Sequence, residues 1–209
     1  MVAVSLKKKT SKHPGEGKTF VTTNLALVFA QNAERVLVID ADLRLPNVGP
    51  SLGLKGEAGL SRWFNGEISL EEATVRDVAP GLDVIPVGMV CKNPTQVINH
   101  PKFLALLEEL RGRYDRIFID SPPIGAVSDA LHLLRRADGV IYVVRYNTVN
   151  LRHAVACLGR LRDAQARVLG VVLNAMSLRM ASDYTDTYDS SYRKYYVDEP
   201  AGEEDRPRA

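Results

Sequence analysis

The chain has 209 residues, and its 27 basic and 25 acidic side chains leave a formal net charge of +2. With 45% apolar and 25% charged residues, it has the composition of one ordinary globular domain. The charge balance gives no support for a nucleic-acid partner, and two distant cysteines exclude a disulfide framework. No apolar run approaches the roughly 18 residues that a membrane-spanning helix needs.

Short β-branched apolar runs alternate with amphipathic stretches, and the two patterns have different hydrophobic periods. In chain order they predict a helix at 18–32, a strand at 36–39, short helices within 50–77, a strand at 82–87, a helix at 101–113, a strand at 116–119, a helix at 127–137, a strand at 140–144, a helix at 150–164 and a strand at 168–173. Pro101 suits the first turn of its helix, and Asn150 suits an N-cap. This order predicts an α/β fold with a mostly parallel sheet and helices on both faces.

The C-terminal segment differs in composition from the rest of the chain. Five of the eight tyrosines lie within thirteen residues of this segment: Tyr184, Tyr188, Tyr192, Tyr195 and Tyr196. Their window has no Leu, Ile or Phe, so it cannot bury enough apolar surface to offset its ordering entropy. We therefore predict a folded domain over 1–180 and a disordered tail over 181–209, whose phenol hydroxyls are accessible phosphate acceptors. The alternative is a tail that is only disordered or adhesive.

The N-terminal part carries the sequence PGEGKT at 14–19, which is typical of a phosphate-binding loop that opens a helix. Glycines in such a loop let backbone N–H groups turn onto phosphate oxygens. We expect the Lys18 ammonium to reach the β- and γ-phosphates of ATP and the Thr19 hydroxyl to bind Mg²⁺. The full eight-residue motif asks for Gly at position 12, where this chain has Lys12. The residues predicted to hold the nucleotide here are Pro14, Gly15, Glu16, Gly17, Lys18 and Thr19.

Three aspartates stand at the ends of predicted strands. Asp40 and Asp42 follow the strand at 36–39, and Asp120 follows the strand at 116–119. Because the carboxyl ends of parallel strands line the ligand crevice of an α/β sheet, we expect all three beside the phosphate loop. Each aspartate alone is equally explained as a helix cap or turn former, but together with the loop they predict a magnesium–nucleotide site.

Three segments and the tyrosine cluster resemble the bacterial tyrosine kinases of capsule and exopolysaccharide synthesis; the segments are PGEGKT, VLVIDADLRLP at 36–46 and YDRIFIDSPP at 114–123. In that family they are called Walker A, Walker A′ and Walker B. Further matches are Asn93–Pro94, Asp129, Arg145 and Asn174. The resemblance implies the P-loop NTPase fold of the MinD/ParA-like ATPases. It also implies an ATP-dependent protein-tyrosine kinase that autophosphorylates its tyrosine cluster and regulates polysaccharide synthesis and export.

The resemblance assigns a role to each matching residue of the site. Asp40 is the candidate base for the acceptor hydroxyl, and Arg44 would steady either the acceptor or a phosphate. Asn174 would read the adenine edge, with a strand-ending turn asparagine as the alternative. The ligands of Mg²⁺, direct or through water, would be Thr19, Asp42 and Asp120.

Partners and location are also implied by the resemblance. The family's kinases are activated by a cytoplasmic segment of a membrane protein that determines polysaccharide chain length. We therefore expect a cytoplasmic protein held at the inner face of the plasma membrane by this activator. A neighbouring copy would phosphorylate the tail, giving a homo-oligomer through tail-to-active-site contacts. The family's N-terminal helix, which supports a ring, has no counterpart before Met1, and this leaves ring assembly open.

The N-terminus departs from the family pattern in two places. Lys7–Lys9 stand where the first strand should be apolar, so we expect a short strand over 2–6 with the lysines turned outward, unless the start of the chain is misassigned. His13 stands where the MinD-like ATPases have a second lysine. The competing hypotheses are an ATPase switch of the MinD/ParA kind and a nucleotide-binding regulator that has lost catalysis.

Overall fold

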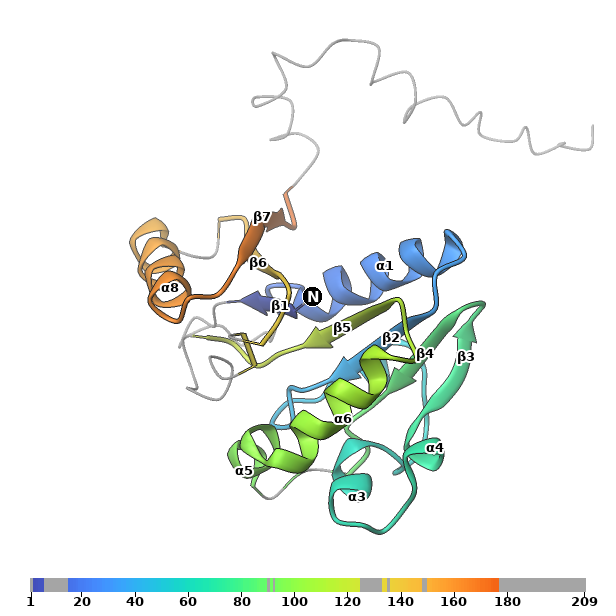
Figure 1. Ribbon diagram of the computed structural model, residues 1–209. Coiled ribbons are helices and arrows are strands. Elements are labelled where there is room, and N and C mark those ends of the chain that lie inside the picture. Colours follow the sequence, from blue (N-terminus) through green and yellow to red (C-terminus); the bar gives the residue numbers. More distant parts are fainter. Residues whose placement is uncertain are drawn as a thin grey trace, which may run out of the picture. The chain divides into compact units, whose positions relative to one another are not determined.

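The computed structural model describes residues 2–5, 15–89, 91, 93–124, 133–134, 136–147 and 150–176. In this part of the chain, seven strands form one sheet in the order β3-β4-β2-β5-β1-β6-β7 (Figure 1). The strands are β1 (Val2–Ser5), β2 (Val36–Asp40), β3 (Val75–Ala79), β4 (Leu82–Ile85), β5 (Arg116–Asp120), β6 (Val140–Arg145) and β7 (Val168–Asn174). The helices are α1 (Lys18–Gln31), α2 (Val48–Ser51), α3 (Leu60–Phe64), α4 (Leu70–Ala73), α5 (Pro94–Asn99), α6 (Pro101–Arg111) and α8 (Leu151–Asp163).

Buried side chains cover both faces of the sheet, and alternate residues of strand β2 belong to two separate apolar clusters. Its two valines pack with Ala26 of α1 in one apolar cluster. Leu37 and Ile39 lie in a second cluster with Phe103 of α6. Successive side chains of a strand point to opposite faces, so helices cover both faces of the sheet (Figure 1). The predicted α/β fold is confirmed.

The core strands and long helices begin and end within a few residues of their predicted positions. Pro101 occupies the first turn of α6. Asn150 caps α8, because its Oδ1 accepts a hydrogen bond from Arg152 N at 2.9 Å. The helix predicted at 127–137 lies mostly outside the described residues, and of its end Leu133 and Leu134 are described as helical.

Strand β3 is absent from the sequence-based prediction, which gave only short helices between 50 and 77. This strand pairs antiparallel with β4 at the edge of the sheet, so the sheet is mixed. Asp77 has a φ of 49°, and the register shifts between Val75 and Ala79. These irregularities break the two-residue period by which a half-buried strand is recognised.

Strand β1 lies inside the sheet, between β5 and β6. Val2 is in register with Ile119 on one side and Val140 on the other. The expected N-terminal strand is therefore confirmed for Val2–Ser5, whereas Lys7–Lys9 and Lys12 lie outside the described residues. The predicted domain boundary at 180 and the tail over 181–209 also lie outside them. Among the helices that the structure describes, none has the length and apolar character to cross a membrane.

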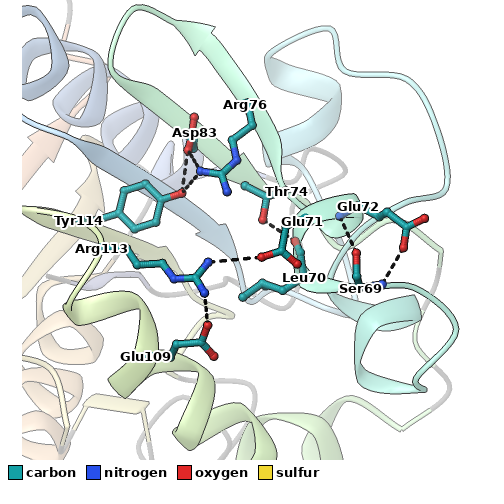
Figure 2. Close-up of polar contacts among 10 residues, drawn as sticks. All are labelled: Ser69, Leu70, Glu71, Glu72, Thr74, Arg76, Asp83, Glu109, Arg113 and Tyr114. Carbon is teal, nitrogen blue, oxygen red and sulfur yellow. Dashed lines mark hydrogen bonds and ion pairs between the residues drawn. The ribbon is translucent and has the colours of Figure 1, made fainter.

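A polar network joins the β3–β4 hairpin to the start of β5 (Figure 2). The Tyr114 hydroxyl donates to Asp83 Oδ2 at 2.7 Å, and Arg76 Nη1 donates to the same oxygen at 2.9 Å. Burial, and next the bond to Asp83, raise the pKa of Tyr114 to about 12, so its hydroxyl stays protonated and donates at neutral pH. The same view shows a second group of ion pairs, formed by Arg113 with Glu71 and Glu109.

We expect Tyr114→Phe to lower the free energy of unfolding by about 1–2 kcal/mol, because a partly buried carboxylate loses one donor while the ring is kept. Equilibrium denaturation in urea measures the change. Asp83→Asn should lower the free energy of unfolding more than Tyr114→Phe does, because it removes the negative charge that pairs with Arg76. Equal stability of Tyr114→Phe and the wild type would contradict an energetic role for this bond.

Candidate nucleotide site

The phosphate loop ends at Gly17, which precedes the first residue of α1. Gly15 and Gly17 have φ angles of 137° and 86°, which residues with a side chain rarely adopt. A Cβ on Gly17 would lie 1.9 Å from Asn174 Nδ2, so this position also lacks space for a side chain. A Cβ on Gly15 would meet no described atom within 4 Å. The loop thus leaves open space beside Gly15, two residues before the N-cap of α1, and a helix N-terminus is a favourable place to bind phosphate.

A buried hydroxyl–carboxylate pair lies next to the loop. Thr19, in the first turn of α1, donates from Oγ1 to Asp120 Oδ2 at the end of β5, at 2.5 Å. Asp120 is fully buried, and its Oδ1 has no hydrogen-bond partner among the residues that the structure describes. Burial raises the pKa of Asp120 to about 6, although the bond from Thr19 and the charge of Lys18 act in the opposite direction. An unpaired oxygen on a buried carboxylate beside a phosphate loop fits a divalent cation.

Asp40 ends β2, the strand next to β5, and is in register with Asp120. Its Oδ1 accepts from Asp42 N at 3.1 Å, and its Oδ2 accepts from the N–H groups of Asn47 and Val48 at 3.0 Å each. Asp40 is fully buried, and burial, followed by the charge of Asp120, raises its pKa to about 7. The Asp40 carboxylate therefore fixes the turn that carries Asp42.

Asp42 lies close to the same buried centre. Its Oδ1 accepts from Leu45 N at 3.2 Å, and only 7% of the residue is exposed. Its negative charge contributes to the raised pKa of Asp120, so the two carboxylates interact. The structure thus brings together the four residues predicted from strand ends and the loop, namely Thr19, Asp40, Asp42 and Asp120. The role of Asp40 as a base stays a prediction.

Burying the Asp40 and Asp120 carboxylates costs stability, and the charge of a neighbouring carboxylate adds to the cost of each. Because the pKa values of Asp40 and Asp120 are raised to about 7 and about 6, the folded chain keeps protons that the unfolded chain has released. We therefore expect the contribution of these two carboxylates to the free energy of unfolding of the metal-free chain to fall as the pH rises from about 4 to about 7. A bound divalent cation would offset part of the cost of ionising these buried carboxylates.

Arg44 lies exposed at the rim of an open hollow. Its Nη2 donates to Thr95 Oγ1 at 3.2 Å. The hollow has a volume of about 550 Å³ and is lined by Arg44, Asn93, Pro94, Thr95 and Gln96. The role of Arg44, toward an acceptor or a phosphate, stays a prediction.

Side chains from the ends of β6 and β7 contact the phosphate loop. Arg145 Nη1 donates to Gly15 O at 2.7 Å, and Asn174 Nδ2 donates to Glu16 O at 2.9 Å. The family resemblance predicted an adenine contact or a strand-ending turn for Asn174 and no role for Arg145. The signal in the sequence was only that both residues end strands at one edge of a parallel sheet. Which loop atoms they contact depends on the tertiary structure.

Several predicted site residues lie outside the described part of the chain; they are Pro14, Asp129, Tyr184, Tyr188, Tyr192, Tyr195 and Tyr196. In the described part, no group of three or more His, Cys, Asp or Glu side chains is arranged to hold a metal ion by itself. Magnesium bound here would therefore combine Thr19, Asp120 and Asp42 with phosphate and water oxygens, which is how this ion is usually held beside nucleotides.

We expect Thr19→Val to weaken ATP binding by about tenfold or more in the presence of Mg²⁺, and to change binding little in a chelator. The variant keeps the shape of the side chain but removes the hydroxyl that bonds to Asp120. Titration calorimetry measures both affinities. Thr23→Val is the matched control, because among the described residues its hydroxyl bonds only to backbone carbonyls within α1. An equal loss in the chelator would rule out a metal-linked role for Thr19.

Comparison with known proteins identifies the family. The model of the AAA domain family matches residues 8–168. Among curated proteins, the tyrosine-protein kinase YwqD of Bacillus subtilis is 35% identical over 175 residues, which are 84% of this chain and 74% of YwqD. The putative tyrosine-protein kinase EpsB of Ralstonia nicotianae is 35% identical over 93% of this chain, but this chain spans only 26% of that longer protein.

Solved structures of kinase domains are also similar to this chain. The VpsO kinase domain is 37% identical to it in sequence, with a TM-score of 0.77 and coverage of 84% of each chain. The septum site-determining protein MinD of Pyrococcus horikoshii, solved with Mg-ADP, is 25% identical, with a TM-score of 0.65 over 89% of this chain and 78% of that chain. The chain therefore has the P-loop NTPase fold and belongs to the family of bacterial tyrosine-protein kinases.

Proposed function

We propose that this chain is an ATP-dependent protein-tyrosine kinase that autophosphorylates its C-terminal tyrosines and thereby regulates the synthesis and export of a capsule or exopolysaccharide. The observation that carries the proposal is the buried Thr19–Asp120 pair beside the glycine loop, within a chain 35% identical to a tyrosine kinase over most of that kinase's length. The tyrosine cluster supplies acceptors within the same sequence.

The reaction transfers the γ-phosphoryl group of ATP to a tyrosine. The bond from the γ-phosphorus to the bridging oxygen of ADP breaks, a bond to the tyrosyl oxygen forms, and the phenol proton passes to a base. Catalysis of this transfer consists mainly of positioning and charge neutralisation. In our proposal, Lys18 and the loop amides hold the β- and γ-phosphates, and Arg44 steadies the acceptor or a phosphate.

A Mg²⁺ ion, when bound, supplies charge neutralisation at the phosphates. In the proposal, Thr19 holds it with a lone pair, because the hydroxyl proton already goes to Asp120. The Asp120 and Asp42 carboxylates hold the ion directly or through water.

Asp40 is the proposed base for the acceptor hydroxyl. Its pKa, raised to about 7, makes it more basic than an ordinary aspartate, which reduces the mismatch with a phenol whose pKa is about 10. Its oxygens accept three backbone hydrogen bonds. A carboxylate has about four lone-pair sites, so one is left over. Because Asp40 is fully buried, the proposal requires the turn after β2 to open before the acceptor hydroxyl reaches this carboxylate.

Acceptor, activator and location complete the proposal. Tyr184, Tyr188, Tyr192, Tyr195 and Tyr196 are phosphorylated by a neighbouring copy, within a homo-oligomer formed by tail-to-active-site contacts. A cytoplasmic segment of a membrane protein that determines polysaccharide chain length activates the kinase and holds it at the inner face of the plasma membrane. Each phosphate adds a charge of roughly −1.5 to −2, which loosens these contacts by repulsion from the acidic residues of the tail.

The likeness to MinD favours a second candidate, an ATPase switch without kinase activity. Incubation of the purified chain with labelled ATP and Mg²⁺, with and without a candidate activator segment, distinguishes the two. The kinase proposal expects label on tyrosine, located by mass spectrometry. Hydrolysis of ATP without any phosphotyrosine, whichever activator is added, would instead identify the ATPase switch.

A further inference from the structure

Two successive carbonyl groups of the phosphate loop are held by side chains from the far half of the chain. Arg145 Nη1 donates to Gly15 O at 2.7 Å, and Asn174 Nδ2 donates to Glu16 O at 2.9 Å. The C=O of one residue and the N–H of the next belong to one planar trans peptide unit and point in opposite directions. Each bond therefore directs one N–H group, that of Glu16 or that of Gly17, away from the side chain that holds the carbonyl of the same peptide unit.

The two donors form one unit at the ends of neighbouring strands. Arg145 and Asn174 are register partners in the β6–β7 pair. Tyr146 N donates to Asn174 O at 2.8 Å, so a backbone hydrogen bond joins β6 and β7 at their carboxyl ends. The Asn174 amide also fills the space beside Gly17, where a Cβ would lie 1.9 Å from Nδ2. A displacement of either strand end would consequently displace the loop.

We infer that Arg145 and Asn174 are positioning residues of the nucleotide site, which orient the loop N–H groups toward the phosphates. On this inference Asn174 acts on the phosphate chain through the loop, whichever base the nucleotide carries. The inference rests on the nucleotide binding in the proposed function, and it adds a role for a strand pair that carries no predicted phosphate ligand. Preorganised donors avoid the cost of ordering the loop when the ligand binds.

The inference predicts a loss of affinity that does not depend on the base. Arg145→Ala and Asn174→Ala should each weaken the binding of Mg-ATP, Mg-GTP and Mg-tripolyphosphate by a similar factor of about five to ten. A factor of this size corresponds to the loss of one hydrogen bond that is coupled to binding. Arg145→Lys keeps a charged donor and should recover part of the loss. Asn174→Asp keeps the shape but replaces the donor by a carboxylate, and should be at least as weak as Asn174→Ala.

Two matched controls separate positioning from stability. Arg111→Ala removes a guanidinium that also donates to a backbone carbonyl, that of Arg136, and Asn32→Ala removes an amide that donates to the carbonyl of Val28. Neither variant should alter any of the three affinities. The melting temperature of each ligand-free variant shows whether the fold is intact. If either alanine variant fails to fold, Arg145→Lys and Asn174→Asp carry the same comparison.

Hydrogen exchange gives a readout that is independent of activity. Tripolyphosphate should slow exchange of the Tyr146 amide in the wild type, because ligand binding to the loop stabilises the strand ends. This effect should be lost in Asn174→Ala.

The affinity measurements can overturn the inference in two ways. A loss of affinity for Mg-ATP alone, with the other two ligands unaffected, would overturn it in favour of adenine recognition. Unchanged affinity for all three ligands in both alanine variants would also overturn it. A wild type that binds none of the three would refute the proposed function itself.

Discussion

The Lys18→Met variant is expected to lose ATP-dependent tyrosine phosphorylation by a factor of about 100 or more. Lys18 is the first residue of α1, and its charge acts on the buried Asp120. The variant removes the ammonium that is proposed to neutralise the β- and γ-phosphates. The side chain is not part of the apolar core, so the melting temperature of the ligand-free chain should change little.

Labelled ATP and phosphotyrosine mapping measure this effect, and titration calorimetry shows how much of it arises from weaker nucleotide binding. Lys55→Met is the matched control, because Lys55 is exposed and lies on the loop after α2, away from the phosphate loop in sequence. Undiminished phosphorylation in Lys18→Met would remove the phosphate loop from the mechanism.

A chain truncated after Met180 should lose nearly all autophosphorylation while it keeps nucleotide binding, because every tyrosine of the cluster follows that point. In the full chain, mass spectrometry should find phosphate on several of Tyr184, Tyr188, Tyr192, Tyr195 and Tyr196. Tyr142 should stay unmodified because it is fully buried. Tyr114 should stay unmodified because its hydroxyl is partly buried and bonded to Asp83.

Mixing two variants tests transfer between copies. A full-length Lys18→Met chain, which cannot phosphorylate itself, should acquire phosphate from the truncated active chain. Absence of label on the full-length partner, with active full-length chains still labelled, would contradict transfer in trans. Tyrosine phosphate that persists in the truncated chain would place the main acceptor elsewhere.

The sequence was sufficient to predict the parts of the fold that depend on local periodicity. Strands β2, β5 and β6 are short, apolar and bounded by polar turns, and parallel strands bring their carboxyl ends to one edge. This is why Asp40 and Asp120 could be placed together before their register was known. The capping of α8 by Asn150 is likewise encoded within a few residues.

The remaining features depend on geometry that no local pattern contains. Strand β3 contains a residue with positive φ and a register shift, so its side chains do not alternate regularly. The contacts of Arg145 and Asn174 with the loop join residues more than a hundred positions apart. The three backbone bonds to Asp40 depend on how the following turn folds back, and a strand-end aspartate alone does not reveal them.

The interior position of β1 has a consequence for how the chain folds. Val2–Ser5 is synthesised long before its two partners, since Val2 pairs with Ile119 and Val140. Until β5 and β6 have left the ribosome, this strand has no neighbour, and closing so long a loop costs entropy before any pairing is gained. We therefore expect the sheet to be completed late, when β1 enters between strands from the second half of the chain. Before that step the nascent chain would expose unpaired strand edges, which favour aggregation.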